Sequence, residues 1–391
     1  MQRPRHLPKH SLTTIMGRCG RTAYQIANQE RALIDHARLL QTFLTLVQID
    51  SPSGQETAIA AELRDRLRAL DVDTHTDPVG NVVGRWEGNG PPLLLSAHMD
   101  TVAPGIGIHP VVEDGVVRSD GSTILGGDDK SGIAVILEAL TALREQGRRP
   151  SVEIAFTVGE ETGLLGAKAL DPAWPRSREA LVLDSGGPLH AIVYGAPASD
   201  KFDVTVHGQA AHAGSNPEDG INAILVAAQG IAHMPLGRID EETTANIGLI
   251  QGGQAVNVVP DRVDMRGEAR SHDVAKLDAQ IAAMRRALEE AVEQHPGARL
   301  ELDIRRSYEA YRLAESEPLI GRIARALDAM GEPAPEFRLS GGGSDANVYN
   351  ARGITAVPIS TGMQAVHTNQ EWIAVSDMVR CAELVIRILA G

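Results

Sequence analysis

The chain has 391 residues, of which 43% are hydrophobic, so it is long enough to bury a substantial core and to form two domains. Its net charge of −14, its 3% aromatic content and the lack of a dense basic block disfavour nucleic acid and anionic membranes as partners. No apolar run approaches the ~18 residues of a membrane span, and Cys19 and Cys381 are too few for a disulfide framework. We therefore expect a cytoplasmic protein.

The N-terminal part of the chain predicts an arm followed by helices. Residues 1–29 contain no acidic residue and no apolar core of a secretory signal, so we expect a disordered arm, or a true start at Met16. A helix is predicted over residues 29–48, because Leu33, Leu40, Leu44 and Val47 form an apolar face. Strands and helices then alternate to about residue 195, which is typical of a mostly parallel α/β sheet.

The first polar cluster follows the apolar strand predicted at residues 93–95. His98 and Asp100 are two positions apart, so both can face one pocket at the end of the strand. One interpretation is a metal-binding imidazole whose second nitrogen is oriented by Asp100. The alternative is an ordinary hydrogen-bonded pair in a loop.

A second cluster precedes a helix predicted from Ile133 onward. Asp128 and Asp129 lie at or just before its N-terminus, where carboxylates commonly cap helices. Because two adjacent acids and Lys130 exceed what a cap requires, we interpret Asp128 as a bridging metal ligand and Lys130 as a charge partner behind the ligands.

Four further candidate residues follow three apolar segments. The strand predicted at residues 152–158 leads into Glu160 and Glu161, of which we assign Glu161 as a ligand and Glu160 as the general base. The alternative is a solvated acidic turn. Asp184 ends the apolar run at residues 181–183, and His367 follows residues 356–362. Open α/β sheets bind ligands beyond the carboxyl ends of their strands, which favours one shared site.

The donor set indicates the metal. Two imidazoles and three carboxylates suit two Zn²⁺ ions per subunit, with Co²⁺ or Mn²⁺ possible. A carboxylate that bridges two such ions would place a water between them as the nucleophile of a hydrolysis.

The segment from Lys201 onward has a different pattern. It predicts a β-α-β-β-α-β order, with strands at 202–206, 247–251, 263–269 and 300–306 and helices at 219–234 and 274–294. Because His367 returns to the first site, this segment is expected to be an inserted ferredoxin-like α+β domain at residues 199–307. The catalytic domain would then comprise residues 30–198 and 308–391.

Six strings in order resemble the co-catalytic dinuclear zinc peptidases, which include peptidase T, carboxypeptidase G, aminoacylase and succinyl-diaminopimelate desuccinylase. They are SAHMDTV, GGDDKSGIA, GEETGLLGAKAL, LDSGG, AAHAGSNPEDGINAI and HTNQEWI. The resemblance implies that His98 and Asp184 hold one zinc, that Glu161 and His367 hold the other, and that Asp128 bridges them. It also implies that Asp100 orients His98 and that Glu160 is the base.

The resemblance implies further roles in the substrate site. His212 would polarise the scissile carbonyl, from the partner subunit in dimeric members, and Asn257 and Arg270 would grip the substrate. Gly342 and Gly343 lie in a glycine run whose backbone can approach a ligand closely. For each of these residues, an ordinary loop or surface position is the alternative.

These observations predict a two-domain metallohydrolase with a lid and dimerisation domain, which is expected to be a homodimer. The strings are most similar to the peptidase T branch, so we expect an aminopeptidase acting on short peptides. The alternatives are an N-acyl-amino-acid deacylase, a carboxypeptidase or, less expected, a non-catalytic small-molecule binding protein.

Overall fold

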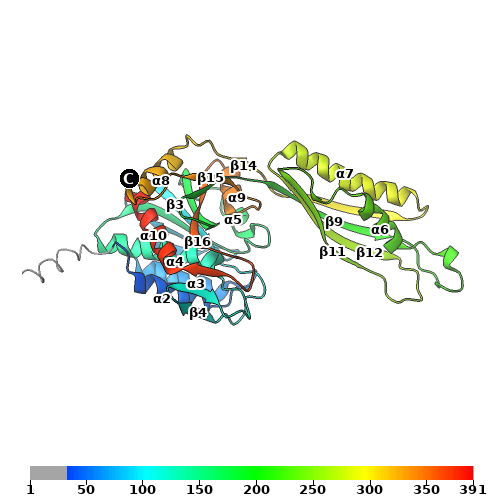
Figure 1. Cartoon of the computed structure of the whole chain (residues 1–391), viewed down its shortest axis with the longest axis horizontal. Coiled ribbons are helices and arrows are strands. Elements are labelled where there is room, and N and C mark those ends of the chain that lie inside the picture. The colour runs from blue at the N-terminus through cyan, green and yellow to red at the C-terminus, as the bar shows by residue number, and fades with distance from the viewer. Residues whose placement is uncertain (1–32, 391) are drawn as a thin grey trace, which may run out of the picture.

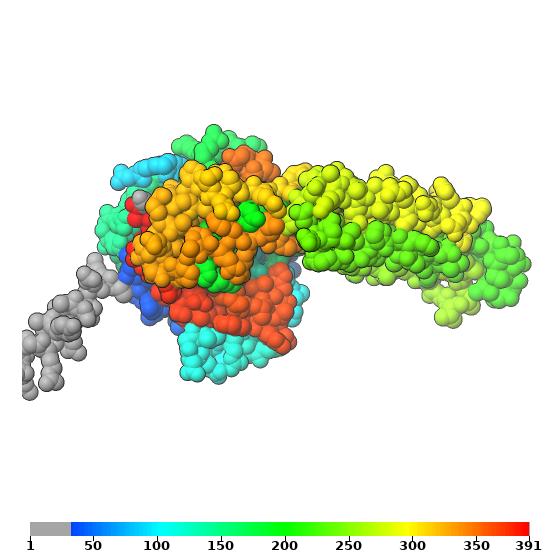
Figure 2. Space-filling view, turned by 45° about the horizontal axis from the view of Figure 1, so that its top comes forward, coloured from blue at the N-terminus to red at the C-terminus, as the bar shows by residue number. Residues whose placement is uncertain are grey.

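The computed structural model describes residues 33–390, so the arm expected at residues 1–29 lies outside the described residues. The described chain folds into a main body around a nine-stranded sheet and a second body around a five-stranded sheet (Figure 1). The second body is elongated and projects from the first (Figure 2). We call this second body, and not residues 1–29, the arm. None of the helices among residues 33–390 is long and apolar enough to cross a membrane.

The main sheet has the strand order β1-β2-β6-β3-β7-β16-β8-β14, with β15 paired to β8. Its strands are β1 (Asp73–Thr76), β2 (Val82–Trp86), β3 (Asn89–His98), β6 (Pro150–Thr157), β7 (Glu179–Gly186), β8 (Ala191–Ala196), β14 (Tyr311–Arg312), β15 (Glu336–Leu339) and β16 (Thr355–Met363). The four central strands β6, β3, β7 and β16 are parallel, whereas β1, β2, β8 and β14 join antiparallel. The predicted α/β class is confirmed, and the sheet is mixed because its flanks reverse direction.

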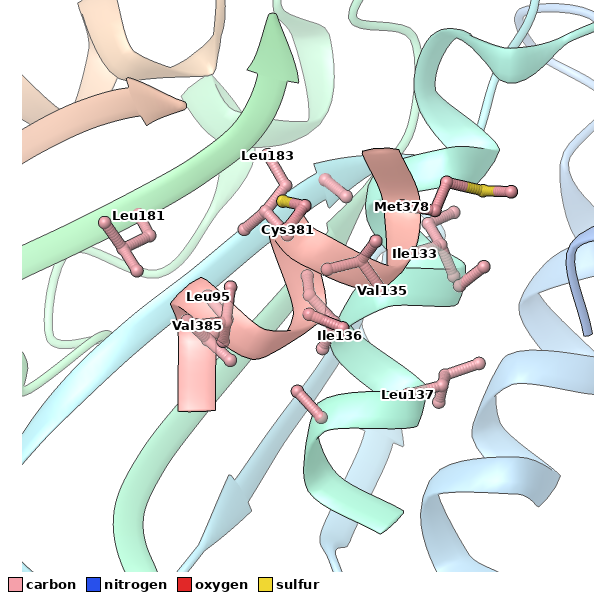
Figure 3. Close-up of a cluster of buried hydrophobic side chains, with 14 of the residues drawn as sticks. Leu95, Ile133, Val135, Ile136, Leu137, Leu181, Leu183, Met378, Cys381 and Val385 are labelled. Carbon is pink, nitrogen blue, oxygen red and sulfur yellow. The ribbon is translucent and has the colours of Figure 1, made fainter. Parts of the chain in front are cut away.

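Helices cover both faces of this sheet. They are α2 (His36–Val47), α3 (Thr57–Ala69), α4 (Gly127–Glu145), α5 (Leu165–Ala169), α8 (Pro318–Ala329), α9 (Asp345–Ala351) and α10 (Val375–Ala390). In β3, Leu93 and Leu95 pack with the cluster beneath α4 and α10, whereas Leu94 packs with Tyr349 of α9 on the other face. This alternation follows from the two-residue period of a strand. Figure 3 shows α4 and α10 packed over Leu95 and Leu181.

The predicted first helix begins later than expected. Asp35 is its N-cap, and the Asp35 carboxylate accepts the backbone N–H groups of Ala37 and Arg38. The helix therefore starts at His36 rather than Gln29. A small sheet of β4 (Pro110–Glu113), β5 (Val116–Ser119) and β17 (Trp372–Ala374) completes the main body.

The five-stranded sheet has the order β10-β11-β12-β9-β13, and its neighbouring strands are antiparallel. Its elements are β9 (Ala198–His207), η1 (Pro217–Asp219), α6 (Ala223–His233), β10 (Gly237–Arg238), β11 (Thr243–Gly252), β12 (Arg262–Ser271), α7 (Val274–Glu293) and β13 (Arg299–Tyr308). The predicted ferredoxin-like arrangement is confirmed, with the short β10 as an addition. The helix expected at residues 219–234 starts at Ala223, because the Asn222 side chain caps it by accepting the Leu225 N–H.

Candidate metal centre

Four of the five candidate ligands lie at the carboxyl ends of the four central parallel strands, and the fifth, Asp128, lies at the start of α4. His98 is the last residue of β3, Asp184 lies near the end of β7, and the Glu160–Glu161 pair and His367 follow β6 and β16. Ser96 pairs with Val182 in the β3–β7 ladder. His98 and Asp184 each lie two residues further along, so the register places them side by side on one face.

Asp128 lies between the two histidines. Its Oδ1 is 3.0 Å from His98 Nε2, and its Oδ2 is 3.0 Å from His367 Nε2. Glu161 Oε1 is 2.8 Å from the same His367 nitrogen. His367 has a φ of 63°, a strained value for a residue with a side chain, and such strain is typical of functional sites. One carboxylate thus presents a separate oxygen to each imidazole.

These residues line a cavity of about 330 Å³. The sequence-predicted residues in its lining are His98, Asp128, Glu160, Glu161, Asp184, Gly342, Gly343 and His367. The structure therefore brings together the expected ligands, the expected base and the glycine run, although they are spread over about 270 positions of the sequence.

Asp100 is buried behind this cavity and contacts both His98 and the glutamate pair. His98 Nδ1 lies 3.0 Å from the Asp100 carbonyl oxygen and 3.4 Å from its carboxylate. The two carboxylate oxygens accept the backbone N–H groups of Glu160 and Glu161 at 3.0 and 3.2 Å. Ser53 Oγ donates a further bond of 2.6 Å to the carboxylate. Asp100 is thus placed to orient the imidazole and the glutamate backbone together.

Two residues not predicted from the sequence hold the preceding part of this loop. The Val158 N–H donates to Asn81 Oδ1, and the Gly159 N–H donates to Glu56 Oε1, both at 3.0 Å. Four consecutive backbone N–H groups from Val158 onward therefore each meet a side-chain acceptor. Such bonds between residues more than 70 positions apart leave no local sequence signal.

The electrostatics of the cavity favour cations. Burial, together with the neighbouring charge of Asp184, raises the pKa of Glu160 well above its ordinary value. Burial and the charge of Asp128 raise the pKa of Asp184 in the same way. Asp128 and Glu161 hold the pKa of His367 at about 10. Buried carboxylates that crowd together repel one another, and two imidazoles do not balance their negative charge. Metal ions would supply the missing positive charge, so the donor set fits a pair of divalent cations.

Two neighbours of Asp128 have hydrogen-bond partners of their own. Lys130 is buried and its Nζ donates to the Ile49 carbonyl at 2.8 Å rather than to Asp128, so its role as a charge partner behind the ligands stays a prediction. Asp129 lies near His98 and Asp184, but its oxygens accept the backbone N–H groups of His98 and Gly132, both at 3.2 Å. Each of its oxygens thus already accepts a backbone bond, whereas the Asp128 oxygens face the two histidines, which favours Asp128 as the ligand.

A buried carboxyl group also went unpredicted on the α9 side of the site. Asp345 accepts the Thr157 hydroxyl at 2.5 Å through Oδ2. Burial raises the pKa of Asp345 to about 6. The signal that could have found it is the string Ser344-Asp345 directly after the glycine run.

Arg270 lies at the border between the two sheets and close to the glycine run. A Cβ added to Gly342 would lie 3.4 Å from Arg270 Nη1, and Arg270 Nη2 pairs with Glu268 at 2.9 Å. The Gly343 N–H donates to the Tyr308 hydroxyl at 3.1 Å. Arg270 is therefore next to the cavity, where a guanidinium can bind a carboxylate.

His212 and Asn257 do not join this cavity within one chain. Both are exposed, and their segments lie together, with the Ala213 N–H donating to the Asn257 carbonyl at 3.0 Å. His212 Nδ1 accepts the N–H groups of Gly214 and Ser215, both at 3.1 Å. The segment that carries His212 and η1, green in Figure 1, lies at the end of the arm far from the main sheet. Their expected roles stay predictions.

Comparisons with known proteins agree with this site. The sequence profile of peptidase family M20/M25/M40 matches residues 94–391. The Bacillus subtilis protein YqjE, described as uncharacterised, is 40% identical over 368 residues, which cover 91% of this chain and 99% of that protein. The crystal structure of aminopeptidase PepT from Bacillus cereus is similar with a TM-score of 0.81 and 38% identity, covering 92% of this chain and 100% of that one. A tripeptidase structure from Staphylococcus aureus gives a TM-score of 0.85 and 36% identity, with 91% and 98% covered. The chain therefore belongs to peptidase family M20/M25/M40, a family of peptide hydrolases that bind a pair of metal ions.

Proposed function

We propose that this protein is an aminopeptidase of the peptidase T type that hydrolyses short peptides with two Zn²⁺ ions per subunit. The observation that carries the proposal is the position of Asp128, whose two oxygens each lie 3.0 Å from a different histidine. A bridging carboxylate has this arrangement. With Asp128 shared, His98 and Asp184 would complete one metal site, and Glu161 and His367 would complete the other. Co²⁺ and Mn²⁺ accept the same donors.

Bound metal ions would supply Lewis acidity, which polarises a carbonyl and acidifies water. The protein would supply the proton transfers. Glu160 lines the cavity and has no ion-pair contact with either histidine, whereas Glu161 contacts His367. Glu160 would accept the proton of the attacking water and deliver it to the amine that leaves, while Arg270 and the backbone at Gly342 and Gly343 would hold the substrate.

The choice of an aminopeptidase rests on the relatives. The two similar structures at 36% and 38% identity are an aminopeptidase and a tripeptidase. An N-acyl-amino-acid deacylase or a carboxypeptidase remains the second candidate, because a guanidinium next to the cavity suits any substrate with a free carboxylate. A non-catalytic binding protein is disfavoured because Glu160 and the five candidate ligands are all present.

We further propose the assignment of the chain to two domains, with residues 30–198 and 308–391 catalytic and residues 199–307 forming a lid that also dimerises. The position of His212 outside its own cavity supports a homodimer, in which this residue would enter the site of the partner subunit. The cytoplasmic location expected from the cysteine content stays a prediction.

The test combines metal analysis with a substrate panel. The purified protein should contain two equivalents of zinc and should release the N-terminal residue of tripeptides faster than it cleaves N-acetylated amino acids. Glu160→Gln should retain both metals and lose about 10²–10⁴-fold in kcat, whereas Glu161→Gln should lose metal. Equal metal loss in both variants would show that their roles are assigned wrongly, and turnover without bound metal would sink the proposal.

A further inference from the structure

Glu371 is a buried carboxylate that no part of the proposed mechanism uses. It is 1% exposed and lies four residues after His367 in the chain, just before β17. Its Oε2 accepts the backbone N–H groups of Leu125 and Gly126 at 2.7 and 2.8 Å. Its Oε1 accepts the N–H of Asp128 itself at 3.0 Å. One carboxylate from the His367 segment therefore binds three amides of the loop that carries the proposed bridging ligand.

The fit around this carboxylate is tight. A Cβ added to Gly127 would lie 2.9 Å from Glu371 Oε1, so the loop and the carboxylate pack against each other directly. Gly126 has a φ of 71°, which is readily adopted only by glycine and turns successive N–H groups towards one side. The buried ammonium of Lys130 supplies a nearby positive charge. The carboxylate thus has defined partners on the side facing the loop.

The backbone of Glu371 is held as well. Its N–H donates to the Thr368 carbonyl at 3.2 Å, which closes a turn next to His367. Its carbonyl accepts the Ser119 N–H at 3.1 Å from β5. A shift of the Glu371 side chain would therefore change the distance between the His367 turn and the Asp128 loop.

We propose that Glu371 is a positioning residue that couples the Asp128 loop to the His367 turn, so that two ligands on separate segments meet one metal ion. This inference rests on the proposed metal centre. Charge-assisted bonds from three amides define the loop conformation more strongly than neutral contacts would. Residues that orient metal ligands typically contribute 10–100-fold in metal affinity. Loss of the Glu371 bonds should therefore weaken metal binding even though Glu371 touches no metal.

The experiment measures Zn²⁺ affinity of the metal-free full chain by competition with a chromophoric chelator. Glu371→Gln keeps the length of the side chain but places an NH₂ group where an N–H needs an acceptor. We expect affinity to fall about 10–100-fold for at least one of the two sites. The matched control is Glu153→Gln. Glu153 is another buried carboxylate, which binds Arg85 of β2 and Ser177 ahead of β7, and neither Glu153 nor these partners line the cavity. This control should lower stability and leave Zn²⁺ affinity unchanged.

A second variant separates positioning from charge. Glu371→Asp keeps the negative charge but is one methylene shorter, so it cannot reach all three amides, and it carries the test if the Gln variant does not fold. Positioning predicts weaker binding in both variants. Wild-type affinity in Glu371→Asp would overturn the inference, and so would equal affinity losses in Glu371→Gln and Glu153→Gln. A wild-type protein that binds no metal would instead overturn the proposed function, so the two failures are distinguishable.

Discussion

The Asn81 side chain offers a direct test of how the fold holds Glu160 and Glu161. It is fully buried, accepts the Val158 N–H at 3.0 Å, and donates to the Gly166 carbonyl at 2.9 Å and to Asp77 at 2.8 Å. Replacement by leucine, which has a similar volume, removes these bonds and places a methyl group against the Val158 N–H. The loop directly ahead of Glu160 would then lose its first anchor.

The magnitude follows from the bonds lost. A buried donor without an acceptor costs about 1–3 kcal/mol, and the lost bond to the carbonyl costs about 1 kcal/mol more. Asn81→Leu should therefore lower the free energy of unfolding by roughly 2–4 kcal/mol. Displacement of Glu160 by a fraction of an ångström should lower kcat by on the order of 10–100-fold, because proton transfer depends steeply on geometry.

The assay has two parts. Urea unfolding followed by circular dichroism gives the free energy of unfolding, and kcat is measured without urea at a temperature where every variant is folded. Asn350→Leu is the control, because the Asn350 side chain also makes three hydrogen bonds, all of them to the backbone of Ala346 and Ala356, at 2.9, 2.9 and 3.3 Å. It should lose stability and retain kcat. If the folded Asn81→Leu protein keeps wild-type kcat, the loop does not depend on this anchor and the reasoning is refuted.

Three further predictions concern pH, substrate binding and assembly. Burial alone would raise the pKa of Glu153, but its bonds from Ser177 and Arg85 hold the pKa below the ordinary value of 4.5. The stability that Glu153 contributes is thus present above about pH 4.5 and is lost as the pH falls below it. The difference in unfolding free energy between wild type and Glu153→Gln should therefore be constant above about pH 4.5 and shrink below it, and a difference that stays constant on further acidification would contradict this. Arg270→Lys should raise KM for tripeptides on the order of tenfold with kcat little changed, since lysine cannot form two parallel bonds to a carboxylate, and an unchanged KM would remove Arg270 from the substrate site. Mixed dimers of Glu160→Gln and His212→Ala subunits should recover part of the activity, because one site would contain both residues intact; verified heterodimers without activity would place His212 outside the partner's site.

The residues at strand ends could be predicted because their signal is local. Apolar runs that stop at His98, Glu160 or Asp184 indicate both a buried strand and the sheet edge where it ends. The split β-α-β-β-α-β order was equally visible from the alternation of strand and helix periods. The strand pattern predicted that His98 and Asp184 share one sheet edge, and the register between β3 and β7 places them side by side there.

Other parts of the site had no such signal. Three side chains accept hydrogen bonds from backbone amides that are distant in sequence, namely those of Asn81, Glu56 and Glu371. Every residue except proline has such an amide, so the sequence does not mark the partner. The surroundings of Lys130 had no local signal either, because its hydrogen bond goes to the carbonyl of Ile49 and the charges that act on it are those of Asp50 and Glu371. The start of α2 was predicted too early, because apolar residues such as Leu33 already occur before Asp35, which caps the helix.

The way the arm joins the main body has a consequence for engineering. The chain leaves β8 for β9 at Pro197 and returns from β13 to β14, and Ala196 pairs with Tyr311. Both connections therefore lie side by side. In the topology of the main body, the whole arm is inserted between the antiparallel strands β8 and β14, where a hairpin would have its loop. The hydrophobic cluster of the arm draws only on residues between Ala198 and Ala310. A short turn that replaces residues 199–307 should thus leave a compact protein, and arms from other family members should be exchangeable at the same two points.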